Sequence, residues 1–327
     1  MYRVVRSINV NTTPRGPLVF VLFTVAVVAI ASACGTEGDE TKTTTPPSST
    51  AQPAISPPAV VARPTSLQPV TFASAQALYA KRQYREASES FADYAESHPN
   101  NPFGHYMLGL SAWKSGDLDV ARGAFERSLA LDSTNVKALL NLGRVLLDQG
   151  KLNDAFVRVG AAIKLDSGSA DAHRMMGRVQ SARGEHDSAM TSYRFALSID
   201  PTDSWSMNNL GLLLIGQGRY EEALSPLARA VALRPEAPAF ANNLGVALER
   251  TGHPSAAADA FRTALKADST YAKAARSLAR VEGKTDSTTV DVGALAVAFN
   301  DEIQAARQTR VVAKNVVKPE SVKPPER

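Results

Sequence analysis

The sequence predicts a solenoid, a fold in which one structural unit repeats along the chain. Three series of small residues recur with the same step of 34 residues through the middle of the 327-residue chain. Periods of about 20 to 50 residues are typical of such repeat architectures. The first glycine series is Gly109, Gly143, Gly177, Gly211 and Gly245, the second is Gly116, Gly150, Gly184, Gly218 and Gly252, and the alanine series is Ala87, Ala121, Ala155, Ala189, Ala223 and Ala257.

Two further motifs within this period indicate the kind of repeat. Leu108 and Gly109 form a Leu-Gly pair that returns in later repeats, and Ala121 is followed four residues later by Phe125, a spacing that also returns. These motifs resemble those of the tetratricopeptide-repeat (TPR) family. The resemblance implies an all-α fold, a TPR α-solenoid in which antiparallel helix pairs form a right-handed superhelix. We expect this solenoid over residues 68–285, as six repeats and a C-terminal helix.

The repeated small residues have a physical task in the expected fold. Two helices of one repeat pack closely only where small side chains meet, which the first glycine and the alanine allow. The second glycine permits the backbone conformation of the turn between the helices. The first repeat has Ala75 and Arg82 at the two glycine positions, as is expected of a terminal repeat with one neighbour. A further helix over residues 286–308 is expected to cap the C-terminal end of the solenoid.

The first 33 residues have the pattern of a signal peptide. Three arginines precede residues 17–30, which form an unbroken apolar run. The segment Ala-Ser-Ala-Cys ends at Cys34, the only cysteine, and resembles a bacterial lipobox with alanine in place of the usual leucine. This resemblance implies lipidation of Cys34. The alternative is an uncleaved membrane anchor, because the uncharged stretch over residues 16–35 approaches the roughly 20 residues of a bilayer span.

The lipobox also implies where the protein is found. We expect a lipid-anchored protein of the bacterial cell envelope. The residue after the cysteine is Gly35 and not an aspartate, which favours the periplasmic face of the outer membrane. Anchoring in the inner membrane is the alternative.

Residues 35–67 and 309–327 are expected to be a disordered linker and a disordered basic tail. The linker is rich in Thr, Ser and Pro and has no aromatic residue, so it cannot bury enough apolar surface to offset the entropy lost on folding. From Arg307 onward there are six basic and two acidic residues, a balance of +4 that equals the net charge of the whole chain. The rest of the chain is therefore neutral, which argues against a nucleic-acid partner.

The sequence predicts no enzyme active site. Its five histidines are scattered and form no His-Glu-x-x-His motif, and the lone cysteine leaves no partner for a sulfur-rich metal site. We therefore expect no catalytic residue, no metal, no cofactor and no small-molecule substrate.

The candidate binding surface is the concave groove that the TPR resemblance implies, lined by the first helix of each repeat. Its positions run from an aromatic end through a basic middle to an asparagine-rich stretch. Asparagine can pair with a peptide backbone, arginine with carboxylates, and aromatic rings with apolar side chains. The predicted partner-binding residues are Tyr106, Trp113, Asn141, Arg144, Arg174, Arg178, Trp205, Asn208, Asn209, Asn242, Asn243 and Arg276.

Some of these residues have a second interpretation. Asn141, Asn209 and Asn243 each precede a Leu-Gly pair, where the side chain can order its neighbours and not touch a ligand. The two-carboxylate clamp of chaperone-binding TPR proteins is not expected. Arg178 stands where that clamp has an asparagine, and Ala239 stands where it has a lysine.

The combination of a lipobox, a flexible spacer and tandem repeats resembles bacterial TPR lipoproteins. It implies a membrane-tethered protein–protein interaction scaffold that binds an envelope protein or peptide. Pilus-assembly and secretion-type lipoproteins, which help assemble outer-membrane channels, are the favoured group. One alternative is an adaptor for peptidoglycan hydrolases or an envelope protease. Another, from a different class, is an inner-membrane-anchored protein with an unrecognised enzymatic role.

Overall fold

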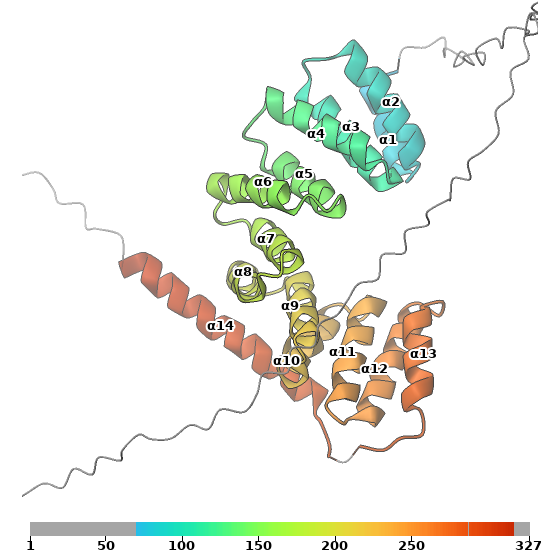
Figure 1. Ribbon diagram of the computed structural model, residues 1–327, viewed down its shortest axis with the longest axis vertical. Helices are drawn as coiled ribbons and strands as arrows, with labels where there is room; N and C mark the ends of the chain where they lie inside the picture. Colours follow the sequence, from blue (N-terminus) through green and yellow to red (C-terminus); the bar gives the residue numbers. More distant parts are fainter. Residues whose placement is uncertain (1–69, 287, 317–327) are drawn as a thin grey trace, which may run out of the picture. The chain divides into compact units, whose positions relative to one another are not determined.

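The computed structural model describes residues 70–286 and 288–316, and in these segments all regular secondary structure is helical. Six helix pairs follow one another and a single helix, α13, follows the last pair (Figure 1), as the sequence predicts. The signal segment, Cys34, the linker at 35–67 and residues 317–327 lie outside the described residues. The helices are α1 (Phe72–Ala80), α2 (Tyr84–Ser97), α3 (Pro102–Ser115), α4 (Leu118–Leu131), α5 (Val136–Asp148), α6 (Leu152–Leu165), α7 (Ala170–Ala182), α8 (His186–Ile199), α9 (Ser204–Gly216), α10 (Tyr220–Leu233), α11 (Pro238–Arg250), α12 (Pro254–Ala267), α13 (Ala272–Val281) and α14 (Val292–Val316).

The two helices of a repeat cross where the first glycine faces a bulky side chain of the second helix. A Cβ atom added at Gly109 would lie 2.7 Å from the ring of Phe125, and one added at Gly177 would lie 2.6 Å from the ring of Tyr193. Both rings are buried, so they have little room to move. The predicted packing role of this glycine is therefore confirmed. In the first repeat, Ala75 takes the same position and is fully buried.

The second glycine series takes the predicted place in the turns. These five glycines have φ angles of 72° to 92°, in the left-handed region that side chains with a Cβ disfavour. In the first repeat, Arg82 stands at this position with a φ of 61°. Within the described segments it is the one residue other than glycine with a positive φ. The first repeat therefore keeps the left-handed turn with an arginine in place of the glycine.

A fourth feature with the same period is the side-chain cap before the first helix of a repeat. Asn101, Asn135, Ser169 and Asp203 precede α3, α5, α7 and α9, and each accepts a hydrogen bond from a backbone N–H two or three residues later. Such a cap stabilises a helix by about 1 kcal/mol. The caps fix where these helices begin, and so they fix which residues share a face.

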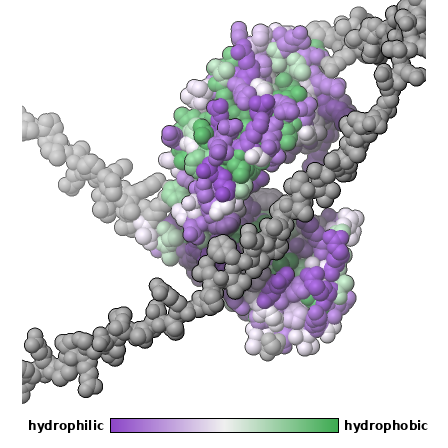
Figure 2. All heavy atoms as spheres, in the orientation of Figure 1, coloured by the Kyte–Doolittle hydropathy of each residue, from purple (hydrophilic) through white to green (hydrophobic). Residues whose placement is uncertain are grey.

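Buried apolar side chains form three clusters, which extend over α1–α3, α3–α7 and α8–α14. The small buried alanines at the helix crossings belong to these clusters. On the face shown in Figure 2, hydrophilic residues cover most of the described surface and apolar residues form small patches. In the described segments, no helix combines the length and the apolar character that a bilayer span needs.

The last helix, α14, differs from the expected cap in both length and position. It continues to Val316, past residue 308, because no glycine or proline interrupts this stretch before Pro319. It packs mainly against α10 and α8 (Figure 1). On α13, Lys273 and Arg276 are exposed and Arg280 pairs with Glu249 of α11, so these polar residues offer no apolar face to a further helix.

The apolar face of α14 explains this position. Phe299 and Ile303 are buried against the cluster that includes Leu197 and Leu224. Polar contacts flank these apolar residues, because Nη2 of Arg229 donates to Oδ1 of Asn300 at 3.1 Å. On α8, Arg194 forms an ion pair with Glu302. The helix therefore binds the second helices of repeats four and five.

Candidate functional site

The twelve predicted partner-binding residues all lie on the first helices of the repeats or on α13. Their contacts divide them into residues tied to one another, residues that are buried, and residues that face open space. By helix they are Tyr106 and Trp113 on α3, Asn141 and Arg144 on α5, Arg174 and Arg178 on α7, Trp205, Asn208 and Asn209 on α9, Asn242 and Asn243 on α11, and Arg276 on α13.

The aromatic end and the basic middle are joined by side-chain contacts between α3 and α5. The amide of Asn141 donates to the hydroxyl of Tyr106 at 3.1 Å and accepts from Nη1 of Arg144 at 2.7 Å. The Arg144 guanidinium lies 5.0 Å from the centre of the Trp113 ring, a cation–π contact. Nε1 of Trp113 donates to Asp148 at 2.9 Å. Asn141 therefore holds the side chains of Tyr106 and Arg144 in place.

Arg144 is held near other positive charges. Burial lowers the pKa of its guanidinium, and the charges of Arg178 and Arg174 lower that pKa further. The carboxylates of Asp171 and Asp148 offset only part of this effect. The three arginines therefore lie close together on α5 and α7, where Asp171 and Asp148 offset part of their charge.

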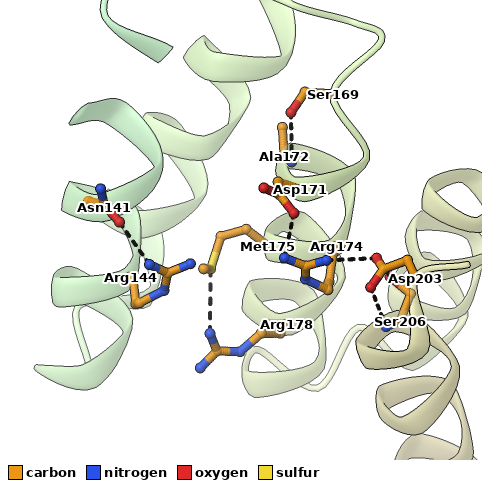
Figure 3. A network of polar contacts seen from close by, with 10 residues as sticks. All are labelled: Asn141, Arg144, Ser169, Asp171, Ala172, Arg174, Met175, Arg178, Asp203 and Ser206. Atoms are coloured by element: carbon orange, nitrogen blue, oxygen red, sulfur yellow. Dashed lines mark hydrogen bonds and ion pairs between the residues drawn. The ribbon is translucent and has the colours of Figure 1, made fainter. Parts of the chain in front are cut away.

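Arg174 is tied to two carboxylates (Figure 3). Its guanidinium forms ion pairs with Asp171 at 2.5 Å and with Asp203 at 2.8 Å. The Asp203 side chain is only 3% exposed and also accepts hydrogen bonds from the backbone N–H and the hydroxyl of Ser206. Burial opposes the charge of Arg174, but the two carboxylates outweigh it and raise the pKa of this residue. Arg174 therefore links repeat four to the start of repeat five.

Arg178 lies one helical turn from Arg174 and has no such partner. Among the described residues, no carboxylate lies within ion-pair distance of Arg178. The Arg178 guanidinium makes a weak contact from Nη1 to the sulfur of Met175 at 4.0 Å (Figure 3). The charge of this arginine is therefore available to a ligand.

Arg178 lines a cavity of about 420 Å³ between α5, α7, α8 and α9. Asn209 lines the same cavity, and its amide has no hydrogen-bond partner among the described residues. Burial raises the pKa of Tyr193, which also lines the cavity, so its hydroxyl stays protonated and can donate. The other lining residues are Leu147, Ser181, Ala182, His186, Leu212, Leu213 and Gly216.

The asparagine-rich stretch is mostly engaged within the protein. Nδ2 of Asn243 donates to Oδ1 of Asn208 at 2.8 Å, which links α11 to α9. Asn208 is 4% exposed and Asn242 is 6% exposed. These two side chains therefore offer almost no surface to a partner. Oδ1 of Asn242 is buried without a hydrogen-bond partner.

Two of the predicted residues remain accessible elsewhere on this surface. Trp205 is 47% exposed, and its ring packs nearly perpendicular to that of Phe240 with the ring centres 4.9 Å apart. Arg234 lies over the Trp205 ring at 5.7 Å. Arg276 on α13 is also exposed. These residues are separate from the cavity that Arg178 lines.

Several residues of this surface are absent from the predicted set. Asp203 gives only a weak signal, as a capping residue that shares its spacing with Asn101, Asn135 and Ser169. Tyr193 matches the aromatic position of the repeat motif and so suggests packing alone. Other lining residues, such as Leu147 and Leu213, resemble ordinary core leucines in the sequence. The described residues contain no cluster of histidine, cysteine, aspartate or glutamate that could hold a metal ion.

Sequence comparison matches most of the described residues to one type of repeat. A profile of the tetratricopeptide repeat matches residues 72–136, 106–159 and 208–281, and a second profile of the tetratricopeptide repeat matches residues 161–236. Together the two profiles cover more than half of the chain. Among curated proteins, no sequence matches the chain.

Several solved structures are similar to this chain. The APC/C hetero-tetramer Cut9–Hcn1 is 16% identical over 64% of this chain and 42% of its own, with a TM-score of 0.57. A tetratricopeptide repeat protein from Parabacteroides merdae ATCC 43184 is 14% identical over 64% of this chain and 82% of its own, with a TM-score of 0.55. MamA is 26% identical over 51% of this chain and 97% of its own, with a TM-score of 0.43. The first two similarities show that this chain and those proteins share a fold.

Proposed function

The chain belongs to the tetratricopeptide-repeat family, and from this premise we propose that its first helices bind an extended segment of a partner protein. TPR proteins are typically non-catalytic scaffolds for protein–protein interactions. The fold alone does not choose a partner, so the proposal depends on the side chains of the site.

The observation that carries the proposal is the cavity lined by Arg178 and Asn209. It combines a charge without a partner, an amide without a partner and apolar walls, including Leu212, which is 43% exposed. Polar groups that point into a largely apolar cavity are typical of binding sites. An asparagine amide can both donate to and accept from a peptide backbone, and leucine side chains provide contact area for an apolar residue of the peptide.

We further propose that this scaffold is tethered in the bacterial cell envelope through a lipid on Cys34, at the periplasmic face of the outer membrane. The support is the signal-like segment over residues 1–33, the lipobox-like Ala-Ser-Ala-Cys and Gly35. Within the envelope, the proposed role is the assembly of a pilus or secretion channel. It depends on the resemblance to lipoproteins of that type.

Copurification from membranes tests the binding proposal. Mild detergent is used to recover the full-length chain and two variants from the membranes of the source bacterium. The variants are Leu212→Arg in the cavity and Arg158→Glu on α6. Arg158 is exposed and lies outside the cavity, so its variant is the matched control. We expect Leu212→Arg to lose envelope proteins that wild type and Arg158→Glu retain. Equal recovery by all three chains would contradict binding at this surface.

A further inference from the structure

Among the groove residues, Arg178 differs from the other two arginines in its charge balance. Arg174 is paired with Asp171 and Asp203, and Arg144 donates to Asn141 and stacks on Trp113. Arg178 has neither a carboxylate nor an aromatic ring as a partner among the described residues. An arginine retains its charge at all physiological pH values, so this site holds a positive charge that the described residues do not balance.

We infer that the cavity lined by Arg178 and Asn209 takes the carboxylate of an aspartate or glutamate side chain from the partner segment, with an aliphatic residue beside it. This inference rests on the proposed function, because it names the chemistry of the segment that the groove binds. The carboxylate would accept hydrogen bonds from the guanidinium, the Asn209 amide and the Tyr193 hydroxyl.

The donors come from three helices and line one cavity. Arg178 lies on α7, Tyr193 on α8 and Asn209 on α9. A guanidinium can bind a carboxylate through two parallel hydrogen bonds, which makes the pair stronger than a contact between neutral groups. The pair is also stronger where apolar walls exclude water, and Leu147, Leu212 and Leu213 form such walls here.

The same walls define the neighbour of the acidic residue. A purely polar ligand would leave Leu212, which is 43% exposed, in water, whereas an aliphatic side chain next to the carboxylate would cover it. A phosphate group is a poorer fit, because it carries more charge than the one unpaired arginine can balance. The lining residues therefore favour an acidic residue beside an aliphatic one.

The place of the cavity in the repeats favours a side chain over a chain end. Groove residues lie on both sides of it, with the half-buried Trp113 on α3 in one direction and the exposed Trp205 on α9 and Arg276 on α13 in the other. An extended segment can therefore continue past the cavity in both directions. An internal aspartate or glutamate is compatible with this path, while a C-terminal carboxylate would end it.

Selection from a random 12-residue peptide display library tests the inference. The selection uses four full-length proteins in detergent: wild type, Arg178→Glu, Leu212→Arg and the control Arg158→Glu. Circular dichroism verifies that each variant is folded. We expect wild type and Arg158→Glu to enrich peptides with an acidic residue next to an aliphatic one. Arg178→Glu is expected to change the preference to lysine and arginine, because the charge at the cavity is reversed.

A double-mutant cycle then measures the interaction between Arg178 and the acidic residue of the peptide. The best selected peptide is synthesised with a blocked C-terminus, and its acidic residue is replaced by the matching amide. Hydrogen bonds to charged groups predict a loss of about tenfold to a hundredfold in affinity for wild type. On Arg178→Gln, the same replacement is expected to change the affinity by less than about twofold, because the partner charge is already missing.

The outcomes separate this inference from the proposed function. If Leu212→Arg abolishes peptide binding but the wild-type selection shows no acidic preference, the groove binds peptides and the inference is wrong. The inference also fails if Arg178→Glu keeps the acidic preference, or if blocking the C-terminus abolishes binding while the side-chain replacement does not. If no peptide is selected, or if Leu212→Arg binds the same peptides equally well, the proposed function fails as well.

Discussion

Replacing Gly177 with alanine tests whether the close crossing of α7 and α8 holds repeat four together. The new methyl group would lie 2.6 Å from Cε1 and 2.7 Å from Cδ1 of Tyr193. Ordinary contact starts near 3.4 Å, so the ring must move by about 0.8 Å. Tyr193 is only 3% exposed and packs in the cluster that includes Ala189 and Leu197, so its ring has little room to move.

The expected magnitude follows from two opposing effects. Overpacking a core costs about 1–3 kcal/mol, whereas alanine gains about 1 kcal/mol over glycine in helix propensity. We expect Gly177→Ala to lower the free energy of unfolding by about 1 kcal/mol. Gly177→Leu adds a much larger side chain at the same crossing and is expected to lower it by more than about 3 kcal/mol.

Gly123 provides a matched control. It lies within α4, and apart from the adjacent residues and backbone of that helix no atom is within 4 Å of the Cβ that a substitution would add. Gly123→Ala is therefore expected to raise the free energy of unfolding by about 1 kcal/mol. Urea unfolding followed by far-ultraviolet circular dichroism measures all three variants. The reasoning is refuted if Gly177→Ala is as stable as Gly123→Ala.

Four further predictions concern stability and anchoring. Arg82→Gly should raise the melting temperature, because the left-handed backbone conformation costs about 1–2 kcal/mol for residues other than glycine. Lys81 has a φ of −77°, so the control Lys81→Gly should not raise it. Asp203→Ala should lower the free energy of unfolding, measured in urea, by about 3 kcal/mol, because Arg174 loses its buried partner and α9 loses its cap. The control Asp171→Ala removes a carboxylate that is 68% exposed, so it should lower this free energy by under about 1 kcal/mol. Phe299→Ala should cost about 3–5 kcal/mol in the packing of α14 and make this helix more sensitive to limited proteolysis, and unchanged cleavage would contradict its docking. Cys34→Ser should prevent labelling with radioactive palmitate and removal of the signal segment, and normal labelling would contradict the proposed lipid anchor.

The repeat positions could be predicted from the sequence because each depends on a requirement of its own repeat. A glycine is needed at Gly177 because α8 crosses there, and at Gly116 because the turn has a positive φ. Both requirements return every 34 residues and so are visible as a period. Even the exception at Arg82 is visible, although the strain of its backbone is not.

The roles of the groove residues could be predicted only in part, because they depend on partners in other repeats. Arg174 and Arg178 are the same residue type, one helical turn apart on α7. They differ because Asp203, which belongs to the next repeat, reaches Arg174 and not Arg178. Asn141 and Asn243 occupy equivalent repeat positions, and each donates to the residue 35 positions earlier, which is Tyr106 in one case and Asn208 in the other. The identity of such a partner is not a property of the repeat motif.

The position of α14 bears on the cavity even though this helix does not line it. Tyr193 forms part of the cavity wall, and Leu197, one turn later on α8, packs in the same cluster as Phe299 and Ile303 of α14. α14 contacts both α8 and α10, which are the second helices of repeats four and five. The first helices of these two repeats, α7 and α9, carry Arg178 and Asn209. Relative movement of repeats four and five would separate these two donors. We expect the packing of α14 against α8 and α10 to restrict that movement, so that less conformational entropy is lost when a ligand binds.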